Sequence, residues 1–192
     1  MKKKLLCIVV FLILVSVLSV NPKILHSQDY KQKLLSETFS GKTAILNELM
    51  VAQSEVLINM YGFTDFDFIP VLMNLEKRGV SVKLILEEAP YLAETENFDI
   101  RDMLKKYGIV TRWAKQDFFL THAKYIVIDG KIAIVLSGNI TYSSFTKNRE
   151  FGIVLNNQQD ASVLRNLFYA DFERKDFENT SEDILISPID SR

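Results

Sequence analysis

The chain has 192 residues, of which 48% are hydrophobic and 24% charged, a composition typical of one folded domain with a sizeable core. Residues 1–27 carry four lysines and no acid, which leaves residues 28–192 with 19 basic and 24 acidic side chains, a net charge of −5. This balance argues against a strongly nucleic-acid-binding surface, and the single cysteine, Cys7, excludes a disulfide framework.

The N-terminus carries three lysines followed by an uncharged apolar run, residues 5–20. A basic start before a short apolar run is typical of a secretory signal peptide. The run is somewhat shorter than the roughly 20 residues that span a bilayer comfortably. We therefore expect residues 1–27 to be a signal peptide, or an uncleaved membrane anchor, with a linker. The protein is expected to be exported, periplasmic or secreted, or to be held at a membrane through residues 5–20.

The first half of the folded part alternates between helical and strand-like patterns. We expect a polar linker with some helical character, then a helix, a strand, a helix and a strand: residues 21–40, 43–53, 55–61, 65–78 and 80–86. Gly79 follows the second helix at the position where a left-handed residue often ends one. The strand–helix–strand unit predicts parallel pairing with a right-handed crossover.

The second half continues the alternation. We expect a helix, a strand, a hairpin, a short helix, a strand, a long helix and a loose tail: residues 98–107, 109–113, 124–136, 141–147, 151–155, 157–176 and 181–192. The pattern predicts an α/β domain over residues 28–180, a layered α-β-α sandwich around a mixed, largely parallel sheet. Trp113, Phe118 and Phe119 flank or lie in the loop before the hairpin, where they line a pocket mouth or belong to the core.

The hairpin carries the chemistry. His122, Lys124 and Asp129 stand in the spacing H-x-K-x-x-x-x-D, and Asp129-Gly130 joins two apolar runs, a strong hairpin signal. Since residues two apart on a strand share a face, His122 and Lys124 are expected to project together. Each alone would more often be a structural histidine or a solvated lysine. More polar residues follow the second strand: Ser137, Asn139, Asn148 and Glu150.

This arrangement resembles the HKD motif of the phospholipase D superfamily, with its trailing G-S-x-N and N-x-E elements. One element departs, because Leu136 stands where the family has a glycine before the serine. The stretches LINMYGFTD and EKRGVSVKLILEE are also similar to the single-motif members, so the resemblance covers residues 43–173. Those members include small exported bacterial endonucleases and the mitochondrial cardiolipin hydrolase type.

The resemblance implies a phosphodiesterase site. His122 would attack phosphorus and form a phosphohistidine, while Lys124, Ser137 and Asn139 would hold the non-bridging oxygens. Glu150 would orient the His122 ring or, alternatively, be a surface acid. Asp129, on the hairpin turn, would play a supporting structural role.

The family chemistry uses two histidines, whereas this chain has only His122 and His26, and His26 has no lysine two residues on. One chain therefore holds half a site, and a twofold homodimer would bring two copies of His122 together. The sequence shows no metal-ligand spacing, P-loop or dinucleotide-binding glycine pattern, so we expect no metal and no cofactor.

Three functions follow from these features. The first is a metal-independent nuclease, and the second is a phospholipase acting on phospholipid head groups. The third is a non-catalytic dimeric module that binds phosphate or nucleic acid on the same fold. The complete set of polar side chains favours a phosphodiesterase and leaves open whether the substrate is nucleic acid or phospholipid.

Overall fold

The centre of the fold is a seven-stranded sheet in the order β1-β7-β6-β5-β2-β3-β4. The computed structural model describes residues 32–36, 39–93 and 95–190, and the N-terminal segment 1–27 lies outside them. The strands are β1 (Gln32–Ser36), β2 (Glu55–Met60), β3 (Ser81–Leu86), β4 (Val110–Trp113), β5 (Lys124–Ile128), β6 (Ile132–Leu136) and β7 (Phe151–Leu155).

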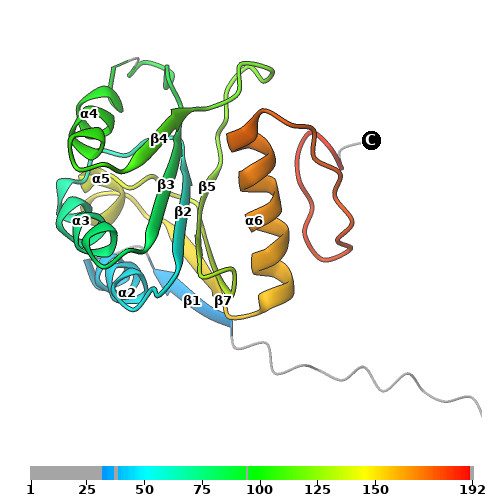
Figure 1. Ribbon diagram of the computed structural model, residues 1–192, viewed down its shortest axis with the longest axis horizontal. Helices are drawn as coiled ribbons and strands as arrows, with labels where there is room; N and C mark the ends of the chain where they lie inside the picture. Colours follow the sequence, from blue (N-terminus) through cyan, green and yellow to red (C-terminus); the bar gives the residue numbers. More distant parts are fainter. Residues whose placement is uncertain (1–31, 37–38, 94, 191–192) are drawn as a thin grey trace, which may run out of the picture. The chain divides into compact units, whose positions relative to one another are not determined.

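Helices cover both faces of this sheet. They are α2 (Phe39–Met50), α3 (Ile69–Lys77), α4 (Phe98–Lys106), α5 (Tyr142–Thr146) and α6 (Gln158–Glu173), with a 3₁₀ turn η1 (Phe66–Phe68) before α3. Figure 1 shows α2, α3, α4 and α5 on one face and α6 on the other. The α-β-α layering and the α/β class expected from the sequence are therefore confirmed.

The strand directions are more often antiparallel than the sequence suggested. The pairs β2–β3 and β3–β4 are parallel, as the strand–helix–strand pattern predicts. The other four neighbouring pairs are antiparallel, so the mixed sheet is not largely parallel. The hairpin accounts for one of them, and β7 returns beside β6 in the opposite direction. Strand pairings of this kind depend on where the chain returns to the sheet, which local periodicity does not record.

Strand β1 was not expected. Residues 32–36 lie in the stretch that we interpreted as a polar linker, yet they pair antiparallel with β7 from Gln32↔Leu155 to Ser36↔Phe151. This edge strand buries Leu35 and leaves Leu34 exposed. A short edge strand with one buried side chain among residues 32–35 is specified mainly by its distant partner, because its own sequence carries little hydrophobic periodicity.

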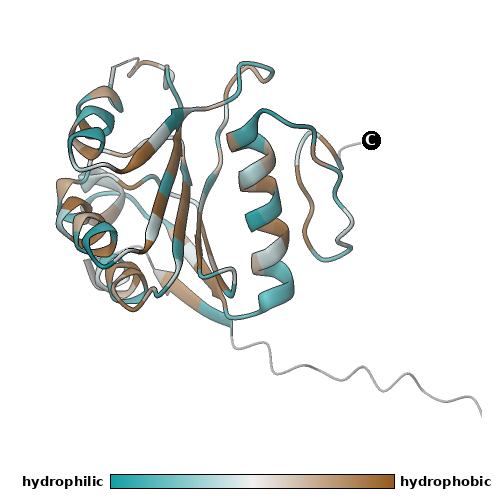
Figure 2. Cartoon of the chain, in the orientation of Figure 1, coloured by the Kyte–Doolittle hydropathy of each residue, from teal (hydrophilic) through white to brown (hydrophobic). Residues whose placement is uncertain are grey.

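Side-chain alternation divides the core into two clusters. On β2, Val56, Ile58 and Met60 belong to the larger cluster, which also includes residues of α2 and α3. Leu57 belongs to the smaller cluster, together with Leu164 of α6. Figure 2 shows the resulting pattern, with apolar strands at the centre and hydrophobic and hydrophilic residues alternating along α6. The period of two on the strands thus decides which helix layer each residue contacts.

The segment after α6 is folded back against this smaller cluster. Ile184 packs on it, and the Asn179 amide donates to the carbonyl of Ile184 at 2.7 Å and to Asp190 Oδ2 at 2.6 Å. These contacts differ from the loose tail expected for residues 181–192. The reason is tertiary, since Ile184 packs against a cluster that residues of the sheet and of α6 form together.

Candidate active site

Asp129 organises the turn of the β5–β6 hairpin. Its carboxylate accepts hydrogen bonds from the backbone N–H groups of Gln53, Ser54 and Glu55 at 3.0, 2.7 and 3.1 Å, and from the Ser54 hydroxyl at 2.9 Å. Burial alone would raise the pKa of Asp129, but these hydrogen bonds outweigh it and hold the pKa below its ordinary value. The carboxylate thus anchors the start of β2, in agreement with a supporting role.

His122 and Lys124 lie at the opposite end of β5. Lys124 is 8% exposed, and its Nζ donates to the carbonyl oxygen of His122 at 3.0 Å. The His122 side chain is exposed. Partial burial, followed by the charge of Lys124, lowers the pKa of His122 below 6.5. The imidazole is therefore neutral near pH 7, the form in which a ring nitrogen can act as a nucleophile.

Tyr61, just after β2, holds both side chains and was not singled out from the sequence. Its ring meets that of His122 edge to face with centroids 4.6 Å apart, and Lys124 Nζ lies 5.2 Å from its centroid. Its hydroxyl accepts from the backbone N–H of Tyr91 at 2.6 Å. Tyr61 thus packs against the His122–Lys124 pair and fixes the loop after β3. Its only signal in the sequence was its place at the end of a buried strand.

Ser137, Asn148 and Glu150 form a second group beyond β6. The Ser137 hydroxyl donates to Glu150 Oε2 at 2.6 Å and accepts from the backbone N–H of Phe151 at 3.0 Å. The Asn148 amide donates to Glu150 Oε1 at 3.3 Å. Among the residues that the structure describes, Glu150 is thus joined to Ser137 and Asn148, and its expected bond to the His122 ring is not formed.

Asn139 approaches the backbone next to Tyr61. A Cβ atom at Gly62 would lie 3.0 Å from Asn139 Nδ2 and 3.2 Å from Glu96 Oε1, so a larger residue at this position would require these two side chains to move by a few tenths of an ångström. Within the described part of the chain, Asn139 Oδ1 is buried without a hydrogen-bond partner. Burial raises the pKa of Glu96, a further side chain that the sequence did not single out. Leu136, at the position of the motif glycine, is buried in the larger core cluster.

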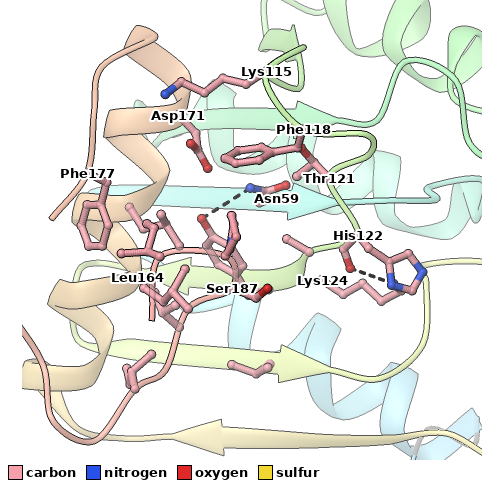
Figure 3. Close-up of a pocket in the computed structure, with 18 of the residues that line it drawn as sticks. Asn59, Lys115, Phe118, Thr121, His122, Lys124, Leu164, Asp171, Phe177 and Ser187 are labelled. Atoms are coloured by element: carbon pink, nitrogen blue, oxygen red, sulfur yellow. Dashed lines mark hydrogen bonds between the residues drawn. The ribbon is translucent and has the colours of Figure 1, made fainter. Parts of the chain in front are cut away.

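A cavity of about 940 Å³ adjoins the end of β5 at which His122 and Lys124 lie. Figure 3 shows it between the sheet, α6 and the C-terminal segment, with His122 and Lys124 at one end and Phe177 at the other. Phe118 lines this cavity, as expected if the aromatic residues of this loop lie at a pocket mouth rather than in the core. The ring of Trp113 instead packs against that of Phe98, with ring centroids 4.9 Å apart. Phe119 is 99% exposed.

The described residues contain neither a candidate metal centre nor a candidate membrane span. No group of three or more of their histidine, cysteine, aspartate or glutamate side chains is arranged to hold a metal ion. No helix in these ranges is long and apolar enough to cross a membrane.

Comparison with known proteins gives consistent matches. The family model described as "Cardiolipin synthase, PLD-like domain" matches residues 45–172. Mitochondrial cardiolipin hydrolase of Mus musculus is 29% identical over 140 residues, which cover 73% of this chain and 60% of the relative. Phospholipase D of Rickettsia typhi is 29% identical over 126 residues, 65% of this chain and 59% of the relative. The chain thus spans about three fifths of the length of these relatives.

Solved structures show the same fold. Nuc, a phospholipase D family member from Salmonella typhimurium, superimposes with a TM-score of 0.66 at 22% identity, covering 78% of this chain and all of Nuc. NucT from Helicobacter pylori gives a TM-score of 0.64 at 19% identity, covering 75% of this chain and 96% of NucT.

Proposed function

The chain belongs to the family of cardiolipin synthase PLD-like domains, and from this premise we propose that it is a phosphodiesterase that uses His122 as its nucleophile. One observation carries the proposal: an exposed imidazole with a lowered pKa lies beside the buried ammonium group of Lys124. A neutral ring can attack phosphorus, and a fixed positive charge can stabilise the charge that develops on the phosphoryl oxygens.

The reaction takes two displacements. In the first, a ring nitrogen of one His122 bonds to phosphorus while the bond from phosphorus to the alcohol oxygen breaks, and a second imidazole, in its protonated form, gives its proton to that oxygen. In the second, water attacks the phosphohistidine, gives up its proton to that second imidazole and releases His122. Lys124 holds the non-bridging oxygens throughout, with the Asn139 amide as a further donor, and the Ser137 hydroxyl joins them when it exchanges its bond to Glu150 for one to the phosphate.

The second imidazole comes from another copy of the chain. His122 is the only histidine among the described residues, since His26 lies outside them. We therefore propose a homodimer in which two copies of His122 face one phosphate across a twofold axis. The substrate is a phosphodiester, either of a phospholipid, the class in the names of the two curated relatives, or of a nucleic acid, the other class that the sequence leaves open.

The proposal is tested with the full-length chain on bis(4-nitrophenyl) phosphate in excess EDTA. The wild-type chain should release nitrophenol, because Lys124 supplies the positive charge. His122→Asn should lower the rate by about 10³-fold or more, as expected when a covalent nucleophile is lost. An acid-labile 4-nitrophenyl phosphoryl group should be trapped on the wild-type chain only.

Lys131→Gln is the matched control, since Lys131 is exposed at the other end of the hairpin. It should retain full activity. Normal turnover by His122→Asn would overturn the mechanism. Complete loss of wild-type activity in EDTA, restored by a divalent cation, would show that Lys124 does not supply the charge.

A further inference from the structure

The cavity beside the active site has apolar walls from three parts of the fold. Val135 and Leu155 contribute from the sheet, Leu167 from α6, and Phe177 and Ile186 from the C-terminal segment. Its volume of about 940 Å³ falls within the roughly 300–1,000 Å³ of small-molecule sites. A cavity of this size and lining accepts an apolar ligand.

This cavity reaches the proposed catalytic residues. His122 and Lys124 are among its lining residues, at the end opposite Phe177. Figure 3 shows both side chains directed outwards from that end. Because these side chains point away from the cavity, a ligand with its phosphate at the imidazole would pass around His122. The remaining part of the ligand would then extend into the cavity.

Exposed apolar side chains surround the cavity. Leu185 is 81% exposed, and Phe118 and Ile189 are each 38% exposed, although all three contribute to the lining. Phe119, next to Phe118 in the chain, is 99% exposed. Large apolar side chains gathered at a binding site suit contact with a lipid surface rather than with water.

The charges in the cavity disfavour a polyanion. Asp117, Asp171 and Asp176 are lining residues, against two lysines, Lys115 and Lys124. Lys115 lies 4.0 Å from Asp117, so its charge is partly balanced. A nucleic-acid strand places a phosphate at every nucleotide, and these carboxylates would repel it. An uncharged hydrocarbon chain carries no such cost.

We propose that this cavity binds one acyl chain of a phospholipid whose phosphodiester lies at His122. The proposal rests on the proposed phosphodiesterase function and assigns its substrate class. The acyl site consists of the face of α6 that carries Leu164 and Leu167, the sheet beneath it, and the segment 177–189 that closes it.

Binding is measured by calorimetry on full-length His122→Asn, which cannot turn the ligand over. The probes are hexyl-, octyl- and decylphosphocholine below their micelle concentrations, since each is a single-chain phosphodiester. Each buried methylene is worth about 0.8 kcal/mol, or about fourfold in affinity. Because ordering the chain offsets part of this gain, the dissociation constant should fall at least about tenfold from hexyl to decyl.

Filling the cavity should remove this dependence on chain length. Leu167→Trp places a large ring in the acyl site from α6, and Ile186→Trp does so from the C-terminal segment, in case one variant does not fold. Asn166→Trp is the matched control, because Asn166 is exposed on the same helix and does not line the cavity. It should retain the full chain-length dependence.

Failure of this inference is distinguishable from failure of the proposed function. Hydrolysis of bis(4-nitrophenyl) phosphate needs no acyl site, so the wild-type chain and Asn166→Trp should both show it, whatever the chain-length dependence of binding. Equal affinity for hexyl- and decylphosphocholine would overturn the acyl site even if that hydrolysis is normal. Displacement of decylphosphocholine by a single-stranded oligodeoxynucleotide, with no effect of Leu167→Trp, would assign the site to nucleic acid instead.

Discussion

At the scale of single residues, the site depends on the surroundings of one imidazole. Tyr61 packs edge to face on the His122 ring, and Lys124 lies close enough to lower its pKa. A lowered pKa keeps the ring unprotonated at neutral pH, where a lone pair is available for attack. The same lysine charge that would stabilise a phosphoryl oxygen therefore also keeps the proposed nucleophile unprotonated.

The pH dependence of His122 follows from these two causes. His122 should titrate below 6.5 in an NMR titration, with its signal assigned by comparison with His122→Asn. Lys124→Met should raise the pKa of His122 towards 6.5, because the charge is removed while burial remains. Since the unfolded chain binds this proton at higher pH than the folded chain, the free energy of unfolding should fall as pH drops through 6.5.

Lys131→Met is the control for this titration, because this exposed lysine lies at the far end of the hairpin. It should leave the pKa of His122 unchanged. A His122 pKa above 6.5 in the wild-type chain, or no change in Lys124→Met, would contradict the interpretation.

At the scale of elements, the two ends of the β5–β6 hairpin have different roles: the turn anchors the fold, and the start of β5 carries the proposed catalytic residues. Asp129 anchors the turn to the start of β2, while His122 and Lys124 lie where β5 begins. At about 3.3 Å per residue, the seven residues from His122 to Asp129 separate the two ends by roughly 20 Å. A change at Asp129 should therefore affect stability rather than chemistry.

Asp129→Ala tests this separation. The variant leaves three backbone N–H groups without their acceptor, and alanine is less suited to the positive φ of 54° at this position. The free energy of unfolding in urea should fall by about 1–3 kcal/mol, the usual cost of losing hydrogen bonds to a charged group. Activity per folded molecule on bis(4-nitrophenyl) phosphate should remain near that of the wild-type chain.

Asp129→Asn is the matched variant, because it retains one acceptor oxygen and tolerates a left-handed backbone. It should lose less stability than Asp129→Ala. In the wild-type chain this contribution is present at neutral pH and is lost as pH falls through the lowered pKa of Asp129. Unchanged stability in Asp129→Ala, or a specific loss of activity, would show that the carboxylate does not act as an anchor.

At the scale of the whole molecule, the proposed reaction needs two imidazoles, and the described part of one chain supplies one. A shared site makes activity depend on both partners. When wild-type chains and His122→Asn chains are mixed, unfolded and refolded together, activity should fall as the square of the wild-type fraction. An equal mixture should retain about one quarter of the activity, because a mixed pair lacks a second imidazole worth roughly 10²–10⁴-fold.

Refolded wild-type protein mixed with Lys131→Gln serves as the control and should retain full activity. A linear dependence on the wild-type fraction would mean that each chain carries a complete site. A monomer with full specific activity in analytical ultracentrifugation at the assay concentration would likewise contradict the shared site.

The sequence by itself predicted the candidate catalytic residues and most of the local structure. The spacing of His122, Lys124 and Asp129, the Asp-Gly turn and the alternating apolar runs predicted the hairpin where the structure has it. The helices α2, α3, α4 and α6 lie where periodicity placed them, with small shifts at their ends. These features are local, because turn geometry and side-chain periodicity depend on residues that are close in the chain.

Tertiary structure decided what depends on residues far apart in the chain. The pairing of β1 with β7, the hydrogen bonds of Glu150 with Ser137, the contact of Tyr61 with His122 and the cavity closed by residues 177–189 all join distant segments. None of these segments carries a sequence pattern that predicts which distant segment it contacts. The sequence thus predicted a phosphodiesterase site. The apolar cavity beside it arises only when α6 and the C-terminal segment pack on the sheet. Such a cavity exists only between surfaces that folding brings together, so local patterns in the sequence do not predict it.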